Sequence, residues 1–84
     1  MKIKIKLFVS LREYLPAEFS KQDSFIMDLN DEETPNDLID RFNIPRKLAH
    51  LVMINGVYVL PEDRDKPLFK EGDVLAIWPP VAGG

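Results

Sequence analysis

Cysteine is missing from this chain of 84 residues, and histidine occurs only once, at His50. Without cysteine the chain has no disulfide, no thiolate nucleophile and no zinc site built from thiolates. The single histidine has no cysteine to activate, and the serines lie in no nucleophile-elbow sequence. These absences leave no recognisable catalytic set, so we expect the chain to be acted upon by other proteins and not to catalyse alone.

Long hydrophobic runs and a strong excess of one charge are missing as well. No apolar segment approaches the length of a membrane span, and none follows the early lysines as it would in a signal peptide. With 14 acidic residues against 11 lysines and arginines, the net charge is −3. We therefore expect neither a membrane nor a nucleic acid as partner, and the lack of cysteine is consistent with a cytoplasmic protein.

Phosphate-binding glycine loops and calcium-binding loops are also missing, and we expect no cofactor and no metal bound by the chain itself. Acidic residues do gather at 31–33, and a second charged run covers residues 62–65. Neither run has the spacing of a metal site. We interpret both as solvated loops, the second with at most a role in docking.

Glycine is scarce, and half of it stands at the end of the sequence. Of the four glycines, Gly56 and Gly72 occupy plausible turns, and the other two are Gly83 and Gly84. Glycine has no Cβ, so a backbone that ends in glycine lets the groups of another protein approach its carbonyl closely. We expect the terminal carboxylate, which Gly84 carries after Gly83, to be the reacting group. The alternative is a frayed terminus without a role.

Periodicity predicts one α+β domain over residues 1–84. Strict alternation of lysine with apolar residues begins the chain, and Asn55-Gly56 is typical of a tight hairpin turn. Thr34 is a good helix N-cap with Pro35 at the first helical position, and the helix ends by Pro45. Strands are expected over residues 2–7, 24–29, 51–54, 57–59 and 74–78. Together they indicate a mixed sheet with one main helix packed on one face, followed by a flexible tail over residues 79–84.

The same alternation assigns side chains to the two faces of the sheet. The inner positions, covered by Leu38 or Phe42 of the helix, are Ile3, Ile5, Leu7, Val52, Ile54, Leu75 and Ile77. Phe8, Met53 and Trp78 fall on the outer face. Exposed apolar residues tend to mark partner surfaces, so we interpret these three as a docking patch. The alternative is that Trp78 covers an open sheet edge while Phe8 packs under the connection over residues 10–19.

Four segments carry a resemblance to a known family. They are Leu-Phe-Val-Ser-Leu-Arg-Glu-Tyr-Leu at 7–15, Val-Met-Ile-Asn-Gly at 52–56, Pro-Leu-Phe-Lys-Glu-Gly-Asp at 67–73 and Ile-Trp-Pro-Pro-Val-Ala-Gly-Gly at 77–84. Over its whole length the chain resembles the MoaD/ThiS sulfur-carrier family of ubiquitin-like β-grasp proteins. Its ending is most similar to the MoaD branch, whose members are small subunits of molybdopterin synthase.

The resemblance implies a chemistry and a set of partners. An adenylating enzyme related to ubiquitin-activating enzymes would use ATP and magnesium to activate the carboxylate of Gly84. A sulfur donor such as a persulfide enzyme would then convert it to a thiocarboxylate, and the molybdopterin synthase large subunit or another acceptor would take the sulfur. The resemblance also implies that four residues of the tail bind the partners: Pro79, Pro80, Val81 and Ala82. The two prolines would project the tail away from the body of the domain, and their alternative role is simply to end the last strand.

Other readings share part of this chemistry. The same carrier could serve thiamine thiazole synthesis, tRNA thiolation or attachment to lysines as a ubiquitin-like modifier. A reading from another class is a non-catalytic β-grasp interaction domain. The molybdopterin carrier differs from the carriers for other pathways in the partner that accepts the sulfur, and the sequence of the chain does not encode the identity of that partner.

Overall fold

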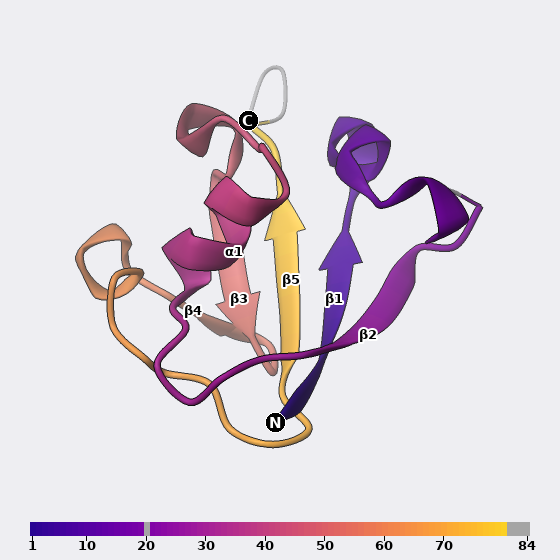
Figure 1. The fold of residues 1–84 in the computed structure, drawn as a ribbon. Coiled ribbons are helices and arrows are strands. Elements are labelled where there is room, and N and C mark those ends of the chain that lie inside the picture. Colours follow the sequence, from indigo (N-terminus) through magenta and orange to yellow (C-terminus); the bar gives the residue numbers. More distant parts are fainter. Residues whose placement is uncertain (20, 81–84) are drawn as a thin grey trace.

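In the part of the chain that the structure describes, five strands form a mixed sheet, and one α-helix lies across one face of it (Figure 1). The computed structural model describes residues 1–19 and 21–80. The strands are β1 (Lys2–Leu7), β2 (Ser24–Asp28), β3 (Leu51–Ile54), β4 (Val57–Tyr58) and β5 (Val74–Trp78), and the helix is α1 (Pro35–Arg41). The predicted α+β architecture is confirmed. β2 and β4 each end one residue before the predicted boundary.

The sheet order is β2-β1-β5-β3-β4, so the first and last strands lie side by side at its centre. β1 and β5 run parallel, and the other neighbouring strands pair antiparallel. Figure 1 shows β1 and β5 both rising from the end of the sheet that carries the N-terminus. This pairing brings residues more than 65 positions apart into register, with Leu7 beside Ile77.

Helix α1 begins with a complete capping box. The N–H of Asp37 donates to Oγ1 of Thr34 (3.1 Å), and the Thr34 N–H donates to Oδ2 of Asp37 (3.0 Å). Pro35 occupies the first turn, where its missing N–H costs nothing. After α1, Asn43 has a φ of 60°, a left-handed conformation that asparagine tolerates well. The helix that the sequence predicts from Thr34 is confirmed at its start and ends within the predicted limit.

Among the described residues, four short 3₁₀ segments connect these elements. They are η1 (Val9–Tyr14), η2 (Ala17–Phe19), η3 (Arg46–Leu48) and η4 (Pro61–Asp63). The segment η1 corresponds to the helical turn expected after the first strand, and its Leu11 is fully buried. The segment η1 follows β1 directly after Phe8, so Phe8 lies where the outer face of the sheet ends.

The core lies between the sheet and α1. Six of the seven predicted inner residues are at most 1% exposed, Ile54 is partly buried, and Leu38 of α1 covers them. Phe42 packs against this core from the end of α1 and is only partly buried. The buried set also includes Leu11, Leu15, Phe25, Leu29, Ile39, Ile44, Val59 and Phe69. One face of the sheet is thus buried, and the opposite face is left for other contacts.

Candidate functional site

The outer face of the sheet is the face opposite α1. Its central row consists of Lys6, Ala76 and Met53, which lie opposite one another on β1, β5 and β3. One step further towards the end of β5, Phe8 and Trp78 continue the same outward parity. All five side chains are partly buried. The sequence placed Phe8, Met53 and Trp78 on one face, and the strand register confirms that placement.

Phe8 and Trp78 stack on each other. Their ring centroids are 4.0 Å apart and their planes differ by 4°. The backbone supports the contact, because the Phe8 N–H donates to the carbonyl of Ile77 (3.1 Å). β5 lies between β1 and β3, so Trp78 does not cover a sheet edge as the alternative reading had it. The two rings present one broad aromatic surface where β1 and β5 end.

A shallow depression of about 320 Å³ lies beside this aromatic pair. We call it the aromatic depression, and it is lined by Lys6, Phe8, Met53, Asn55, Gly56, Val74, Ala76 and Trp78. An aromatic pair, a methionine and small side chains make a surface suited to an apolar group of another protein. The three residues of the predicted docking patch therefore line one concave surface, and their role in docking stays a prediction.

The β3–β4 turn fixes the rim of the aromatic depression. Asn55 and Gly56 have φ angles of 52° and 81°, as a tight hairpin turn with two left-handed residues requires. Oδ1 of Asn55 accepts from the Val74 N–H (2.9 Å), and its Nδ2 donates to Oδ1 of Asp73 (2.8 Å). Beyond Gly56 itself and its chain neighbours, no atom lies within 4 Å of the position that a Cβ would take there. The positive φ angle, and not a lack of space, is therefore the reason for a glycine at this position. The asparagine thus ties the turn to the start of β5.

The chain leaves the sheet next to the aromatic depression. The His50 N–H donates to the carbonyl of Trp78 (3.0 Å), which is the last backbone anchor of β5. Pro79 is buried and Pro80 is exposed. The predicted site residues Val81, Ala82, Gly83 and Gly84 lie outside the described residues. The residues described therefore place the exit of the chain beside Trp78.

Arg64 is a residue that the sequence reading missed. It was assigned to a solvated loop, but only 8% of it is exposed. Its guanidinium donates to three backbone carbonyls, those of Val59 (3.0 Å), Ala49 (3.0 Å) and His50 (3.3 Å). A fourth bond reaches the hydroxyl of Tyr58 (3.3 Å). Arg64 thereby holds the segment whose N–H anchors Trp78, although no local pattern in the sequence signals it.

The resolved pKa shifts belong to ion pairs away from the outer face. A bidentate hydrogen bond from Arg46 (3.1 and 2.8 Å) lowers the pKa of Asp40, and the same contact raises the pKa of Arg46. A hydrogen bond to Asp63 raises the pKa of Lys66. Both pairs are exposed, so they stabilise the fold only weakly. The Asp40–Arg46 pair connects α1 to η3, and the Asp63–Lys66 pair lies at the loop after η4.

Residues 1–19 and 21–80 contain neither a metal-binding cluster nor a helix that could span a membrane. No group of three or more histidine, aspartate or glutamate side chains there is placed to hold a metal ion. No helix in this part of the chain is long and apolar enough to cross a membrane.

Solved structures with the same arrangement identify the fold. SAMP1 from Haloferax volcanii aligns with a TM-score of 0.63 and 23% identity, each chain being covered completely. One chain of the complex of subunits 1 and 2 of molybdopterin-converting factor from Helicobacter pylori aligns with a TM-score of 0.58 and 20% identity, again over both full chains. This chain is a ubiquitin-like β-grasp protein, with the aromatic depression of its outer face beside the chain exit.

Sequence comparison gives the family. The model of the ThiS family matches residues 5–84. The molybdopterin synthase sulfur carrier subunit of Drosophila ananassae is 29% identical over 86 aligned positions, which cover 98% of this chain and 90% of the relative. Its counterpart in Drosophila sechellia is 34% identical over 62 positions, or 69% of each chain. The chain belongs to the ThiS family, the MoaD/ThiS sulfur-carrier family that its sequence resembles.

Proposed function

We propose that this protein carries sulfur as a thiocarboxylate on Gly84 and donates it in molybdopterin synthesis. The observation that carries the proposal is the position of Trp78. This residue lines the aromatic depression and also holds the last anchored carbonyl before the chain exit. A partner that docks on the outer face is thus positioned to receive the end of the chain. Membership of the ThiS family and likeness to sulfur carrier subunits support the same assignment.

Activation begins at the carboxylate of Gly84, which is ionised at neutral pH and a poor electrophile. One of its oxygens attacks the α-phosphorus of ATP, pyrophosphate leaves, and an acyl adenylate forms. A persulfide enzyme then supplies sulfur that displaces AMP, and reduction of any acyl disulfide by a thiol leaves the thiocarboxylate. The adenylating enzyme holds ATP and magnesium, and this chain binds neither.

Donation of the sulfur converts the thiocarboxylate of Gly84 back to a carboxylate. The thiocarboxylate sulfur displaces an oxygen substituent from a carbon of the pterin precursor in the large subunit of molybdopterin synthase, and a thioester then joins carrier and precursor. Water cleaves the bond between this sulfur and the carbonyl carbon of Gly84, so the sulfur stays on the precursor and the carboxylate of the carrier is restored. Gly83 and Gly84 suit this step because a chain without Cβ atoms passes through a narrow channel. Pro79 and Pro80 limit the conformations of the preceding segment, and Val81 and Ala82 contact the channel.

Docking uses the outer face in both steps. Phe8, Met53 and Trp78 contact the adenylating enzyme first and the sulfur-accepting subunit later. The Helicobacter pylori neighbour is itself one subunit of a two-subunit complex, which supports a large subunit as the accepting partner. Thiazole synthesis, tRNA thiolation and conjugation to proteins would share the activation step and differ only in the acceptor.

The test is intact mass spectrometry of the chain after incubation with the adenylating enzyme, ATP, magnesium and a sulfur donor. We expect the native chain to gain the mass difference between sulfur and oxygen. A variant with one residue added after Gly84, and one lacking Gly84, should gain nothing, because small displacements of a reacting atom cost large factors in rate.

Circular dichroism should show both variants folded as the native chain is. Sulfur found at the end of the extended variant would contradict the proposed chemistry. The acceptor is tested separately, by adding the thiocarboxylate form to the purified large subunit with the pterin precursor. Absence of the dithiolene product there, with activation intact, would exclude molybdopterin synthesis and leave the other acceptors.

A further inference from the structure

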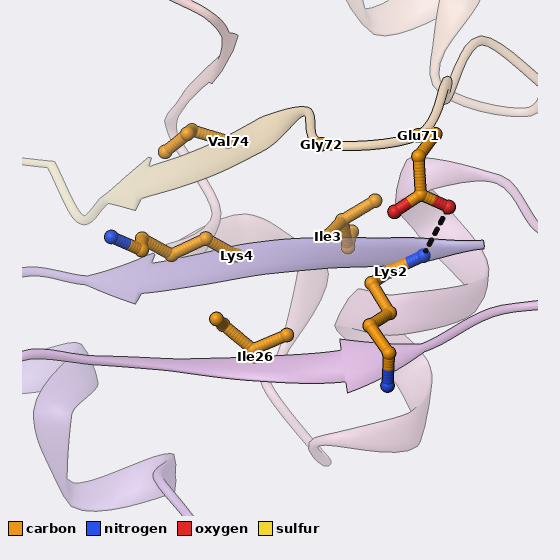
Figure 2. Close-up of a pocket in the computed structure, with 7 residues that line it drawn as sticks. All are labelled: Lys2, Ile3, Lys4, Ile26, Glu71, Gly72 and Val74. Atoms are coloured by element: carbon orange, nitrogen blue, oxygen red, sulfur yellow. Dashed lines mark hydrogen bonds between the residues drawn. The ribbon is translucent and has the colours of Figure 1, made fainter.

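A second depression of about 310 Å³ lies on the outer face, towards the N-terminal end of the sheet (Figure 2). We call it the lysine depression. It is lined by Lys2, Ile3, Lys4, Ile26, Glu71, Gly72 and Val74. The proposed sulfur chemistry gives it no role, because it lies at the end of β5 away from the chain exit.

Its walls are apolar and come from strands on both sides of β1. Lys4 lies opposite Ile26 of β2 and opposite Val74 of β5, so these three residues form one row across the sheet. Ile26 is 61% exposed, and Val74 is partly buried. Figure 2 shows Ile26 and Val74 on either side of the strand that carries Lys4. An apolar side chain from another protein would contact both.

The charge of this region is opposite to that of the molecule. The chain has a net charge of −3, yet β1 directs Lys2, Lys4 and Lys6 to the outer face. Nζ of Lys2 is paired with Oδ2 of Asp28 (3.2 Å). Within residues 1–19 and 21–80, neither Lys4 nor Lys6 has an ion-pair partner. Two ammonium groups on this face therefore remain available to carboxylates of a partner.

The lysine depression adjoins the aromatic depression on the outer face. Val74 lines both, and Lys6 lies on the same strand between Lys4 and Phe8. Two residues along a strand span only about 7 Å. A protein that covers the aromatic depression with an interface of ordinary size would therefore reach Lys4 as well.

We propose that the lysine depression receives an apolar side chain of the sulfur-accepting subunit, flanked by carboxylates that pair with Lys4 and Lys6. This inference rests on the proposed function, since it concerns the same partner. A polyanion such as nucleic acid fits less well. Ile26 and Val74 offer no contact to phosphates, and the carboxylates of Asp28 and Glu71 flank Lys2 and would repel them.

The experiment is calorimetric titration of the purified large subunit of molybdopterin synthase with the full chain, at about 50 and 300 mM salt. We expect Lys4→Glu to weaken binding about tenfold or more at low salt and to reduce its salt dependence. Lys4→Arg keeps the charge and should bind as the native chain does. Ile26→Ser should weaken binding about fivefold, because it removes only the apolar contact.

Lys66→Glu is the matched control, since it makes the same change of charge in the loop after η4, away from the outer face. If Lys4→Glu binds as tightly as Lys66→Glu, the inference is wrong. It is also wrong if a short single-stranded oligonucleotide competes with the large subunit for the native chain but not for Lys4→Glu.

Failure of this inference can be told apart from failure of the proposed function. The same titration with Trp78→Ala tests whether the proposed partner docks on the aromatic depression. Weaker binding of Trp78→Ala with unchanged binding of Lys4→Glu would overturn only the lysine depression. No binding of the native chain to the large subunit would overturn both.

Discussion

Trp78 makes one contact through its ring and another through its backbone. Its ring is one half of the stack with Phe8 on the outer face, and its carbonyl is held by the N–H of His50. The ring can be removed while the backbone bond stays. A substitution at this position therefore removes the ring from the proposed docking surface and leaves the backbone anchor at the chain exit in place.

We expect Trp78→Ala to weaken binding to both the adenylating enzyme and the large subunit by about 2 kcal/mol or more, as loss of a central interface aromatic does. Trp78→Phe should retain most of the affinity, because a smaller ring can still stack on Phe8. Calorimetric titration against each purified partner is the measurement. Unchanged affinity of Trp78→Ala for both partners would exclude the aromatic depression as a docking site.

At the scale of elements, Arg64 joins parts that are distant in the sequence. Its guanidinium holds the carbonyls at the start of β3 and after β4, and its own carbonyl accepts from the Asn36 N–H in α1 (2.9 Å). Loss of the guanidinium would leave buried carbonyls without a donor, which is costly in a protein interior.

We expect Arg64→Met to lower the free energy of unfolding by about 2–4 kcal/mol, since methionine fills similar volume but donates no hydrogen bond. Urea titration followed by circular dichroism measures this loss. The matched control is Arg12→Met, because Arg12 is exposed and makes one long bond to the Gln22 carbonyl (3.4 Å). Equal and small effects of the two substitutions would contradict the structural role of Arg64.

The contrast between Arg64 and the strands shows what the sequence could predict. Alternation fixed the faces of β1 and β5, and the threonine–proline pair fixed the start of α1, because both signals are local. Arg64 was assigned wrongly because three of its four hydrogen-bond partners are backbone carbonyls, which every residue carries. The stacking of Phe8 on Trp78 was also missed, since it depends on the parallel register of two strands far apart in the chain.

At the scale of the whole molecule, stability depends on a single small core. A domain of this size buries only about 60% of the surface that its unfolded chain exposes, so each inner side chain is a large share of the total. Ile5 lies at the centre of this core, between β2 and β5, and is fully buried.

We expect Ile5→Ala to lower the free energy of unfolding by about 2–5 kcal/mol, through lost burial and the cavity that remains. Ile26→Ala is the matched control on the same sheet, because 61% of Ile26 is exposed. It should cost less than about 0.5 kcal/mol. Thermal and urea unfolding of the two variants give the comparison, and a similar loss in both would contradict the assignment of inner and outer faces.

The central pairing of β1 with β5 also has a consequence for the order in which the protein can form. The two strands that support the aromatic pair are the first and the last in the chain. Their contact therefore closes one of the longest loops that this chain can form. A nascent chain that lacks residues 74–78 has no β5 to pair with the edge of β1 that faces away from β2. In such a chain Phe8 also has no ring to stack on. The outer face that we propose for docking is therefore incomplete until synthesis has passed Trp78, and a partner that recognises it would not bind incomplete chains.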